Sequence, residues 1–458
     1  MKEVCIALLI CNIYAQNGYD PAEPPDLPEE AKFYLEAPKA VQIHEKQCKN
    51  TLKYLHILYR HGDRNPSTLL PNDPENGEST WKEGLGEITV KGLQQQYRLG
   101  QWLRKRYGEF LGNDFSRKDI YVRSSDYSRT IMSALANLAG MFPANITEKW
   151  ETSLDWVPIP VHTVDKERDF QLNEQLSCPM ATAAIDSINS DPNVIKIEKA
   201  HEDLLKHLEE KSGVKKPLRL REMWWIFDAL NCEFHHRETH KWPSWINESV
   251  WKRVQQLYDQ SAQFSFHNKQ LRRLRGGALV AEIFERLRSK INGSLEIDGP
   301  KKAYIYSAHD TTLAACLSTF GIVPHVFPLY ATAVLIELHK IDGKDVIEIY
   351  YKNVTDSEAL YQMEIPGCSG LCEVEALHAQ LESLFPIDWY SECGRPIATS
   401  NTSLWVIIAI LALMNIVCLS VICVDIVIRK QLKPRRRLPR PFERNLMADD
   451  DDEIDLEL

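Results

Sequence analysis

Residues 51–66 read TLKYLHILYRHGDRNP, and this stretch decides the fold. Its first half is a nearly unbroken run of apolar and aromatic residues, which is typical of a strand buried on both faces. The run stops at the charged segment RHGDR (60–64), and Pro66 prevents a simple continuation of the strand. We therefore predict a buried strand that delivers charged side chains to a loop at its carboxyl end.

The charged segment predicts an anion-binding site. Arg60 and Arg64 flank His61, and positive charge nearby disfavours the imidazolium form, so His61 is expected to be neutral and nucleophilic. The same two guanidiniums can hold a planar or tetrahedral oxyanion through paired donors. We expect an anion as the ligand of this loop.

Two later segments repeat the pattern of a strand that ends in charged residues and is followed by a helix. The first strand ends at Arg123, and the helical spacing that follows has a capping residue at Ser125 or Asp126. The second strand ends at His309 and Asp310, again with a helix behind it. Three such units indicate an α/β sheet.

In an open α/β sheet, the carboxyl ends of the strands can assemble one site from distant parts of the chain. We therefore expect one pocket to contain the charged residues of all three units, namely Arg60, His61, Arg64, Arg123, His309 and Asp310. Phosphoryl transfer needs this inventory: positive charge around the oxygens, an in-line nucleophile and a proton for the leaving oxygen. We expect neither a metal nor another cofactor, because the arginines supply the charge.

The overall composition sets the limits for this interpretation. The chain has 458 residues, of which 44% are hydrophobic and 26% charged, so it can bury a large core in one large domain or two closely packed ones. Its formal net charge of −10 argues against a protein whose whole surface attracts nucleic acid. Cationic sites are expected to be local.

Both ends of the chain predict a single-pass type I membrane protein. Residues 1–15 resemble a secretory signal peptide, although residues 4–14 could instead form a first core strand. Residues 404–428 are largely apolar and long enough to cross a bilayer of about 30 Å as a helix. The basic start of residues 429–458 then places this tail in the cytoplasm and the body in a lumen or outside the cell. The proline-rich residues 16–47 are expected to form an extended lead-in.

This topology permits glycosylation and disulfide bonds. Five glycosylation sequons precede the membrane helix, at Asn145, Asn247, Asn292, Asn353 and Asn401. Seven of the eleven cysteines lie in the body, namely Cys48, Cys178, Cys232, Cys316, Cys368, Cys372 and Cys393. Because seven is odd, at least one thiol is free or pairs between chains.

The motifs RHGDR (60–64), RSSD (123–126) with Arg129-Thr130, and His309-Asp310 together resemble the histidine acid phosphatases, branch 2 of the histidine phosphatase superfamily. The similarity extends over about residues 53–393 and is greatest to the lysosomal and prostatic acid phosphatases of animals. The resemblance implies that the substrate is a small phosphate monoester. It also implies the residue roles: His61 forms a phosphohistidine, Asp310 protonates the leaving alkoxide, and the phosphate is bound by Arg60, Arg64, Arg123 and His309.

The resemblance further implies a large α/β domain with a central mixed sheet flanked by helices. This domain would comprise residues 48–165 and 295–395, with a smaller, mainly helical domain inserted at 166–294. The helical spacing of residues 193–211 and 248–288 agrees with such an insertion. Homodimerisation is a habit of the family that this sequence does not itself demonstrate.

Disulfide pairing follows partly from spacing and partly from the resemblance. Cys368 and Cys372 are close enough in sequence to close a small loop, and the resemblance pairs Cys178 with Cys393. The partners of Cys48, Cys232 and Cys316 stay open, because Ala333 stands where relatives have the partner of Cys232.

Some residues have a second interpretation. Arg123 could form a surface ion pair, and Asp310 could serve only as a helix cap. For Arg129, pairing with an acid is favoured over substrate contact. A further group resembles a metal site by its spacing but lacks a complete ligand set, so we interpret it as surface or core residues: Cys232, His235, His236 and His240.

We predict an acid phosphatase anchored in the lysosomal or the cell-surface membrane. An acid compartment suits it because Asp310 must be protonated to act as an acid. One rival is a catalytically silent receptor or adhesion ectodomain on the same scaffold. The other is a phosphatase specialised for inositol phosphates or lysophosphatidate, since spacing does not reveal the pocket for the leaving group.

Overall fold

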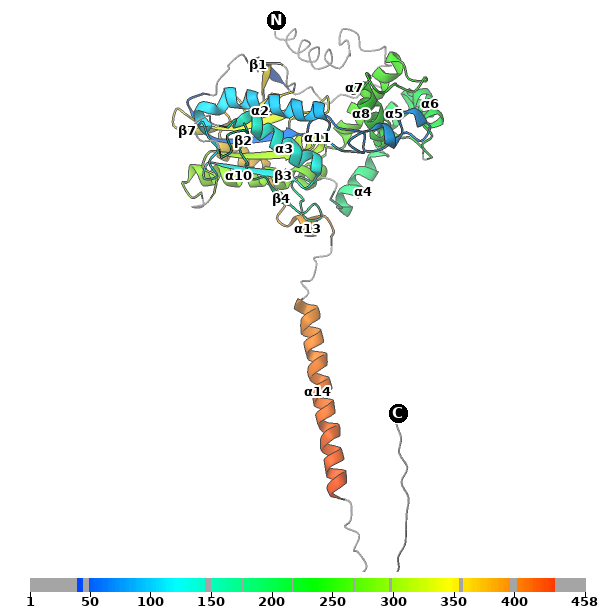
Figure 1. The fold of residues 1–458 in the computed structure, drawn as a ribbon, viewed down its shortest axis with the longest axis vertical. Coiled ribbons are helices and arrows are strands. Elements are labelled where there is room, and N and C mark those ends of the chain that lie inside the picture. Colours follow the sequence, from blue (N-terminus) through cyan, green and yellow to red (C-terminus); the bar gives the residue numbers. More distant parts are fainter. Residues whose placement is uncertain are drawn as a thin grey trace, which may run out of the picture. The chain divides into compact units, whose positions relative to one another are not determined.

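Strand β2 (Leu52–Arg60), the apolar run quoted above, lies inside a mixed sheet (Figure 1). It pairs in parallel with β5 (Ala303–Ala308) and antiparallel with β6 (Ala333–Ile341). Every residue of β2 except Lys53 is buried. The prediction of a strand buried on both faces is therefore confirmed.

In the described part of the chain, the sheet has eight strands in the order β1-β8-β7-β6-β2-β5-β3-β4. The remaining strands are β1 (Ala40–Ile43), β3 (Ile120–Ser125), β4 (His162–Val164), β7 (Lys344–Lys352) and β8 (Leu360–Met363). Strands β2, β5, β3 and β4 run parallel, whereas β6, β7, β8 and β1 pair antiparallel. The parallel half brings the carboxyl ends of its strands to one edge.

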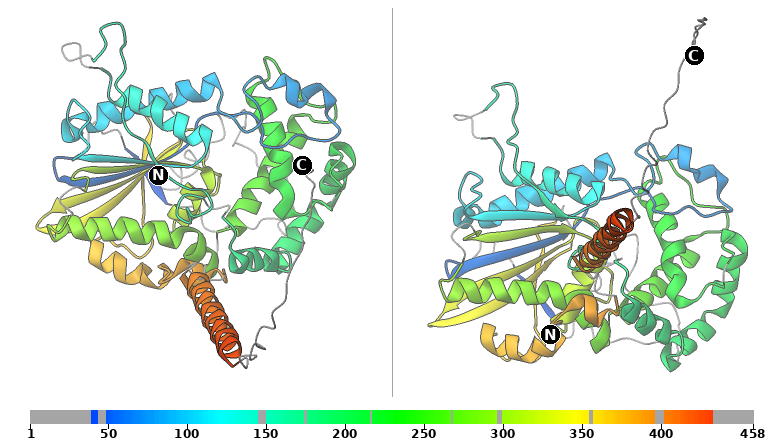
Figure 2. Two further views of the ribbon diagram at one scale, coloured as in Figure 1. Left: turned by 60° about the horizontal axis from the view of Figure 1, so that its bottom comes forward. Right: turned by 90° about the horizontal axis from the view of Figure 1, so that it is seen from below.

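Helices cover both faces of the sheet (Figure 2). One apolar cluster joins Leu55, Ile57 and Tyr59 of β2 to α2 (Val90–Leu111) and α3 (Ser128–Met141). The other joins Tyr54 and Leu58 to the helices α10 (Ala278–Ile291), α11 (Asp310–Thr319) and α12 (Val374–Leu381). The alternation follows from the period of two along a strand. The predicted α/β class is confirmed.

A group of helices with its own apolar cluster lies beside these layers. Its helices are α4 (Pro179–Ile188), α5 (Pro192–Ala200), α6 (Glu202–Ser212), η4 (Leu220–Glu222), α7 (Met223–His235), α8 (Glu248–Phe264) and α9 (Lys269–Leu271). A π-helical turn, Arg272–Gly277, then leads into α10, which packs on the sheet. The predicted insertion at 166–294 therefore includes one helix of the sheet's own layer.

The computed structural model describes residues 39–43, 49–144, 150–173, 176–215, 217–266, 268–295, 299–353, 357–395 and 402–432. Residues up to Arg395 form one compact unit, and Pro396–Leu458 form a second. The predicted signal peptide, Cys48, Asn145, Asn401 and most of the predicted tail lie outside the described residues. Of the predicted lead-in, residues 40–43 are strand β1 at an edge of the sheet.

The second unit contains α14 (Thr402–Gln431). Its segment Trp405–Gln431 is long and apolar enough to cross a membrane, close to the predicted 404–428. Two polar residues near and beyond its middle are bonded inside the helix: Asp425 pairs with Arg429 at 2.7 Å, and Asn415 donates to the Leu411 carbonyl at 2.9 Å.

Both expected disulfides are present. Cys178, which precedes α4, is bonded to Cys393 beyond α13 (Trp389–Glu392), and Cys368 is bonded to Cys372. Cys232 and Cys316 are buried free thiols. The Cys178–Cys393 bond ties the last segment of the compact unit back to the helical group, whereas Cys368–Cys372 closes a short local loop.

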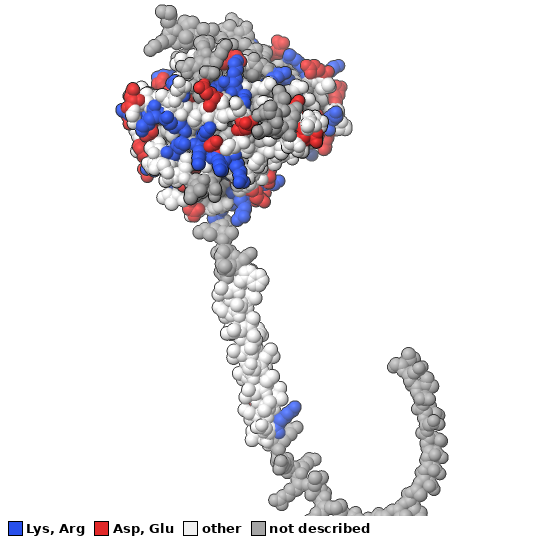
Figure 3. All heavy atoms as spheres, turned by 60° about the vertical axis from the view of Figure 1, so that its left-hand side comes forward, with Lys and Arg blue, Asp and Glu red and all other residues white. Residues whose placement is uncertain are grey.

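The surface features agree with most of the expectations. Lys and Arg side chains gather over part of one face, among scattered acids, so positive charge is local as predicted (Figure 3). The sequon residues Asn247 and Asn292 are exposed. Asn353 is only 4% exposed, which contradicts an exposed glycan acceptor at that position.

Candidate active site

Charged side chains from separate segments line a cleft of about 710 Å³ at the carboxyl ends of β2 and β5. Five of the six predicted site residues line it, namely Arg60, His61, Arg64, His309 and Asp310. The expectation that they converge is therefore confirmed for these five.

His61 directly follows β2 and is 2% exposed. Its Nδ1 lies 2.8 Å from the Gly62 carbonyl oxygen, so Nδ1 carries the proton and donates it there, leaving a lone pair on Nε2. Burial and the nearby guanidiniums of Arg129, Arg60 and Arg64 hold the pKa of His61 well below its ordinary value. The geometry produces a neutral imidazole with a fixed tautomer.

The loop that carries His61 packs tightly against the start of α2. A Cβ atom on Gly62 would lie 2.1 Å from the Gly92 carbonyl oxygen, so the backbones approach as closely as only glycine allows. Asp63 then accepts hydrogen bonds from Thr89 Oγ1 at 2.6 Å and from His236 Nε2 at 2.7 Å. These contacts fix the loop from both sides.

Arg60 lies between the loop and the proton-donor candidate. Its Nη2 is 2.9 Å from Asp310 Oδ2, its Nη1 donates to the Pro328 carbonyl at 2.7 Å, and its guanidinium lies 4.2 Å from the Tyr330 ring centroid. Asp310 opens α11, and its Oδ1 accepts from the Thr311 amide at 2.8 Å. The carboxyl is therefore held at the edge of the cleft.

Arg64 is oriented by the helical group. Its Nη2 donates to Asp228 Oδ1 at 2.7 Å, and Asp228 Oδ2 accepts from the Ser67 amide at 2.7 Å. Asp228 belongs to α7, so this contact joins the helical group to the RHGDR loop. Sequence analysis missed Asp228, because nothing local marks an acid on a distant helix as the partner of Arg64.

His309 directly follows β5, stands at the N-cap position of α11 and is buried. Its Nε2 lies 2.9 Å from Ser125 Oγ, at the end of β3. Burial and the charges of Arg129, Arg64 and Arg60 hold the pKa of His309 well below its ordinary value. The predicted RSSD motif therefore reaches the site through Ser125.

Arg123 does not line the cleft, so the position of this residue does not support the expected phosphate contact. It is paired in register with Tyr306, whose side chain lies in the apolar layer of α10, and Arg123 points to that same face. There it donates to Asp169 at 2.6 Å and Gln171 at 2.5 Å. The alternative of a structural ion pair is the one observed, although the pair is buried and not at the surface.

Arg129, and not Arg123, is the arginine of the 123–130 segment that reaches the cleft. It lies in the first turn of α3, lines the cleft, and has its guanidinium 4.6 Å from the Tyr127 ring centroid. Burial and the neighbouring charge of Arg64 lower the pKa of Arg129 to about 10. The position of Arg129 in the cleft favours substrate contact over the acid pairing preferred from the sequence, although the charges of Asp310 and Asp228 also act on its guanidinium. The signal for this position was that first-turn side chains point back toward the strand end.

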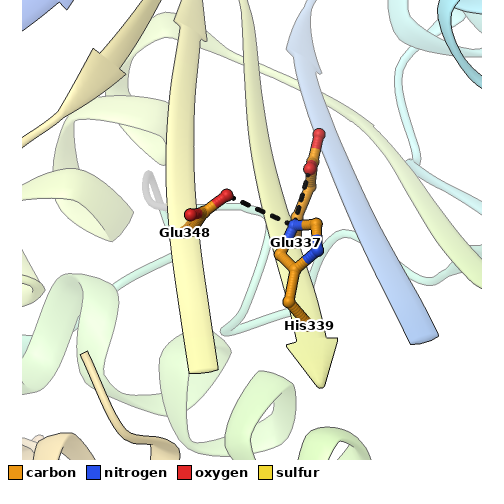
Figure 4. A group of neighbouring side chains, drawn as sticks. All are labelled: Glu337, His339 and Glu348. Carbon is orange, nitrogen blue, oxygen red and sulfur yellow. Dashed lines mark hydrogen bonds and ion pairs between the residues drawn. The ribbon is translucent and has the colours of Figure 1, made fainter. Parts of the chain in front are cut away.

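A separate cluster of Glu337, His339 and Glu348 has the composition of a metal site (Figure 4). His339 Nε2 lies 2.9 Å from Glu337 Oε2 and 3.4 Å from Glu348 Oε2. The other carboxylate contacts come from protein donors: Arg106 and Tyr107 on Glu337, and Lys49 and Tyr350 on Glu348. Because cations and hydroxyls of the protein already satisfy both carboxylates, we interpret the cluster as a structural network.

The second suspected metal group is likewise engaged elsewhere. Cys232 Sγ lies 3.5 Å from Tyr330 Oη, His236 binds Asp63, and the His240 ring stacks on Trp81 at a centroid distance of 3.8 Å. Cys232 and His240 are buried and His236 is partly buried, in agreement with their interpretation as surface or core residues.

Comparison with known proteins agrees with this geometry. The chain matches the histidine phosphatase superfamily (branch 2) over residues 51–352. It is 43% identical over 392 residues to putative acid phosphatase 5 of Caenorhabditis elegans, which covers 85% of this chain and 89% of the relative. It is 34% identical over 367 residues to prostatic acid phosphatase of Rattus norvegicus (79% and 93%) and 33% identical over 391 residues to human lysosomal acid phosphatase (84% and 90%).

Solved structures share the fold. A phytase of Hafnia alvei superimposes with a TM-score of 0.57 at 17% identity, covering 76% of this chain and 99% of the phytase. A phytase of Klebsiella sp. ASR1 gives a TM-score of 0.56 at 16% identity, covering 76% and 98%. At this identity, the likeness concerns the fold alone.

Proposed function

The chain belongs to branch 2 of the histidine phosphatase superfamily, and from this premise we propose that it is an acid phosphatase that hydrolyses phosphate monoesters through a phosphohistidine. The observation that carries the proposal is His61, a neutral imidazole whose Nδ1 is bound to Gly62 and which lies among three guanidiniums in a cleft. The acid phosphatases among its relatives support the same activity.

In the first step, His61 Nε2 attacks phosphorus in line with the ester oxygen. Arg60, Arg64, Arg129 and His309 neutralise or donate to the phosphate oxygens, which is where electrostatic stabilisation lowers the barrier most. Asp310 protonates the leaving oxygen, and the alcohol departs. Of the residues assigned from the sequence, only Arg123 is replaced, by Arg129.

In the second step, water attacks the phosphohistidine. Asp310 has lost its proton in the first step and now accepts one from the water, so the same carboxyl serves both halves of the reaction. Phosphate is released, and His61 is again neutral. An acid compartment favours the carboxylic acid form of Asp310 that the first step requires.

A chromogenic phosphomonoester assay between pH 4 and 6 tests the activity. Wild type is expected to be active and His61→Ala inactive, and rapid quenching is expected to trap an acid-labile, base-stable phosphoryl group on the peptide containing His61. Activity that His61→Ala does not reduce would refute the assignment. If neither wild type nor His61→Ala were active, the catalytically silent receptor or adhesion ectodomain would be favoured.

The architecture and location are also proposals. The predicted division is an α/β phosphatase domain of residues 48–165 and 295–395 with an insertion at 166–294. We now end the insertion at the start of α10, because α10 packs on the sheet and belongs to the α/β domain. The separate apolar cluster of the helical group supports this insertion. Residues 404–428 anchor the chain in a membrane, with 429–458 in the cytoplasm and the catalytic unit lumenal or extracellular. The human lysosomal relative favours the lysosome over the cell surface. Dimerisation stays an expectation from the family.

A further inference from the structure

His309 has one ring nitrogen that is bound to the protein and one that is not. Its Nε2 lies 2.9 Å from Ser125 Oγ. Among the described residues, no group bonds its Nδ1, and although His309 stands at the N-cap position of α11, its side chain makes no capping hydrogen bond. The residue lines the cleft, and its ring centroid lies 5.6 Å from that of His61. Nδ1 is therefore the nitrogen that a ligand beside His61 can meet.

The proton on this nitrogen decides whether His309 attracts or repels a phosphate. Burial and the nearby arginine charges hold the pKa of His309 well below its ordinary value, so the ring is neutral and carries a single proton. With that proton on Nδ1 the ring donates to a phosphate oxygen, whereas with the proton on Nε2 it presents a lone pair to the anion. The tautomer is therefore set by the group that holds Nε2.

Two buried hydroxyl groups lead away from Nε2. Ser125 ends β3 and Thr130 lies in the first turn of α3; both are fully buried, and Ser125 Oγ lies 2.9 Å from Thr130 Oγ1. Each hydroxyl has one proton to donate. If the protons run from Thr130 through Ser125 to His309, Nε2 accepts and Nδ1 carries the proton. If they run the other way, Nε2 carries it.

The direction of this chain follows from the carbonyls around Thr130. Its Oγ1 also lies 2.9 Å from the carbonyl oxygens of Ser125 and of Tyr127. A carbonyl oxygen has two lone pairs, and the Ser125 carbonyl already accepts from Ser124 Oγ at 2.8 Å and from the Tyr127 amide at 2.9 Å. The Tyr127 carbonyl accepts from the amides of Thr130 at 3.1 Å and Ile131 at 3.0 Å. Because neither carbonyl lacks a donor, the Thr130 hydroxyl is free to donate to Ser125 Oγ, and Ser125 to Nε2.

We propose that Ser125 is a positioning residue: its hydroxyl donates to Nε2 of His309, so that the neutral ring keeps its proton on Nδ1 and donates a hydrogen bond to a phosphate oxygen. The inference rests on the proposed function, since phosphate is the ligand bound beside His61. It makes His309 a donor that carries no charge of its own, beside arginines that would repel an imidazolium. Thr130 sets the direction of the chain from behind.

Nitrogen-15 NMR of the full-length protein, labelled at histidine, reads the tautomer directly. The chain has 14 histidines, and the His309→Gln variant identifies the signals of His309. Wild type is expected to show a protonated Nδ1 and an unprotonated Nε2 at this residue. In Ser125→Ala, Nε2 has lost its donor, so the two tautomers are expected to mix. Protonation of Nε2 in wild type would overturn the proposal.

Steady-state kinetics test the consequence for the reaction. Ser125→Ala is expected to lower kcat for a phosphate monoester by about tenfold, against about a hundredfold for the loss of a whole donor. KM is expected to change little, because the hydrogen bond strengthens as charge builds on the oxygens in the transition state. Ser125→Thr keeps the hydroxyl and most of kcat. Ser318→Ala, the matched control, removes an equally buried hydroxyl on α11 that has no hydrogen-bond partner in the described part of the chain, and leaves kcat unchanged.

Two kinetic results would refute the positioning role: a kcat of Ser125→Ala no lower than that of Ser318→Ala, or equal losses in Ser125→Ala and Ser125→Thr with the wild-type tautomer in both. If Ser125→Ala did not fold, the tautomers of wild type and Ser125→Thr would decide. If wild type hydrolysed no phosphate monoester, the proposed function would fail, whereas NMR would still show whether Ser125 sets the tautomer of His309.

Discussion

At the scale of single residues, the two arginines of the 123–130 segment differ in the groups on which their positive charges act. Arg123 is neutralised by Asp169 in the layer of α10, whereas Arg129 lines the cleft and acts on both His61 and His309. We expect Arg129→Gln to reduce kcat/KM for a phosphate monoester by about a hundredfold, the order of loss found when one stabilising donor is removed.

Arg123→Gln is the matched comparison, because it makes the same substitution at the other arginine of this segment, six residues earlier. It is expected to lower the melting temperature, since Asp169 would be left as a buried, unpaired carboxylate, while the folded protein keeps most of its kcat/KM. Steady-state kinetics and thermal unfolding of both variants distinguish the two roles. Greater catalytic loss in Arg123→Gln than in Arg129→Gln would contradict the assignment.

At the scale of elements, the position of the RHGDR loop depends on how closely it approaches α2. A Cβ on Gly92 would lie 2.1 Å from the Asp63 carbonyl oxygen, whereas one on Gly108 in the same helix would find its nearest neighbour at 3.6 Å. We expect Gly92→Ala to displace the loop, costing about 1–3 kcal/mol of unfolding free energy and most of the activity. Gly108→Ala should be neutral or stabilising by up to about 1 kcal/mol. Urea unfolding and a phosphatase assay measure both; a neutral Gly92→Ala would show that the loop can shift freely.

Features that depend on one short stretch of sequence could be predicted, whereas features that depend on contacts between elements could not. The apolar run of β2 and the charged ends of β2 and β5 are local patterns, and they predicted the sheet and five site residues. The face of the sheet toward which Arg123 points depends on its register against Tyr306. The ion pair between Asp228 and Arg64 depends on how α7 packs against the RHGDR loop. Neither the register nor the packing is encoded in a short stretch. The expected cap at Ser125 or Asp126 failed for a related reason: β3 continues through Ser125, and the helix begins later, after Tyr127.

At the scale of the whole molecule, two buried carboxyls are expected to make the folded protein more stable at acid pH than at neutral pH. Burial and the neighbouring Asp73 raise the pKa of Glu233 on α7 to about 9, and burial raises the pKa of Asp259 on α8 to about 7. Each is therefore protonated in the folded protein at a pH where the unfolded chain has already lost that proton. The stability that they contribute is full below about pH 4, near the ordinary carboxyl pKa, and is lost as pH rises.

This linkage gives a prediction for stability against pH. Between about pH 4.5 and 9, protonated Glu233 makes the unfolding free energy fall by up to about 1.4 kcal/mol per pH unit. Glu233→Gln removes the titration while keeping a hydrogen-bonding side chain, so its unfolding free energy is expected to decline less steeply and to exceed that of wild type at pH 7.5. Glu238→Gln, an exposed change five residues later, is the control and should follow wild type. Urea unfolding at pH 5, 6.5 and 7.5 measures the slopes; parallel slopes for Glu233→Gln and wild type would show that Glu233 is ionised in the folded protein and that its burial beside Asp73 does not favour acid.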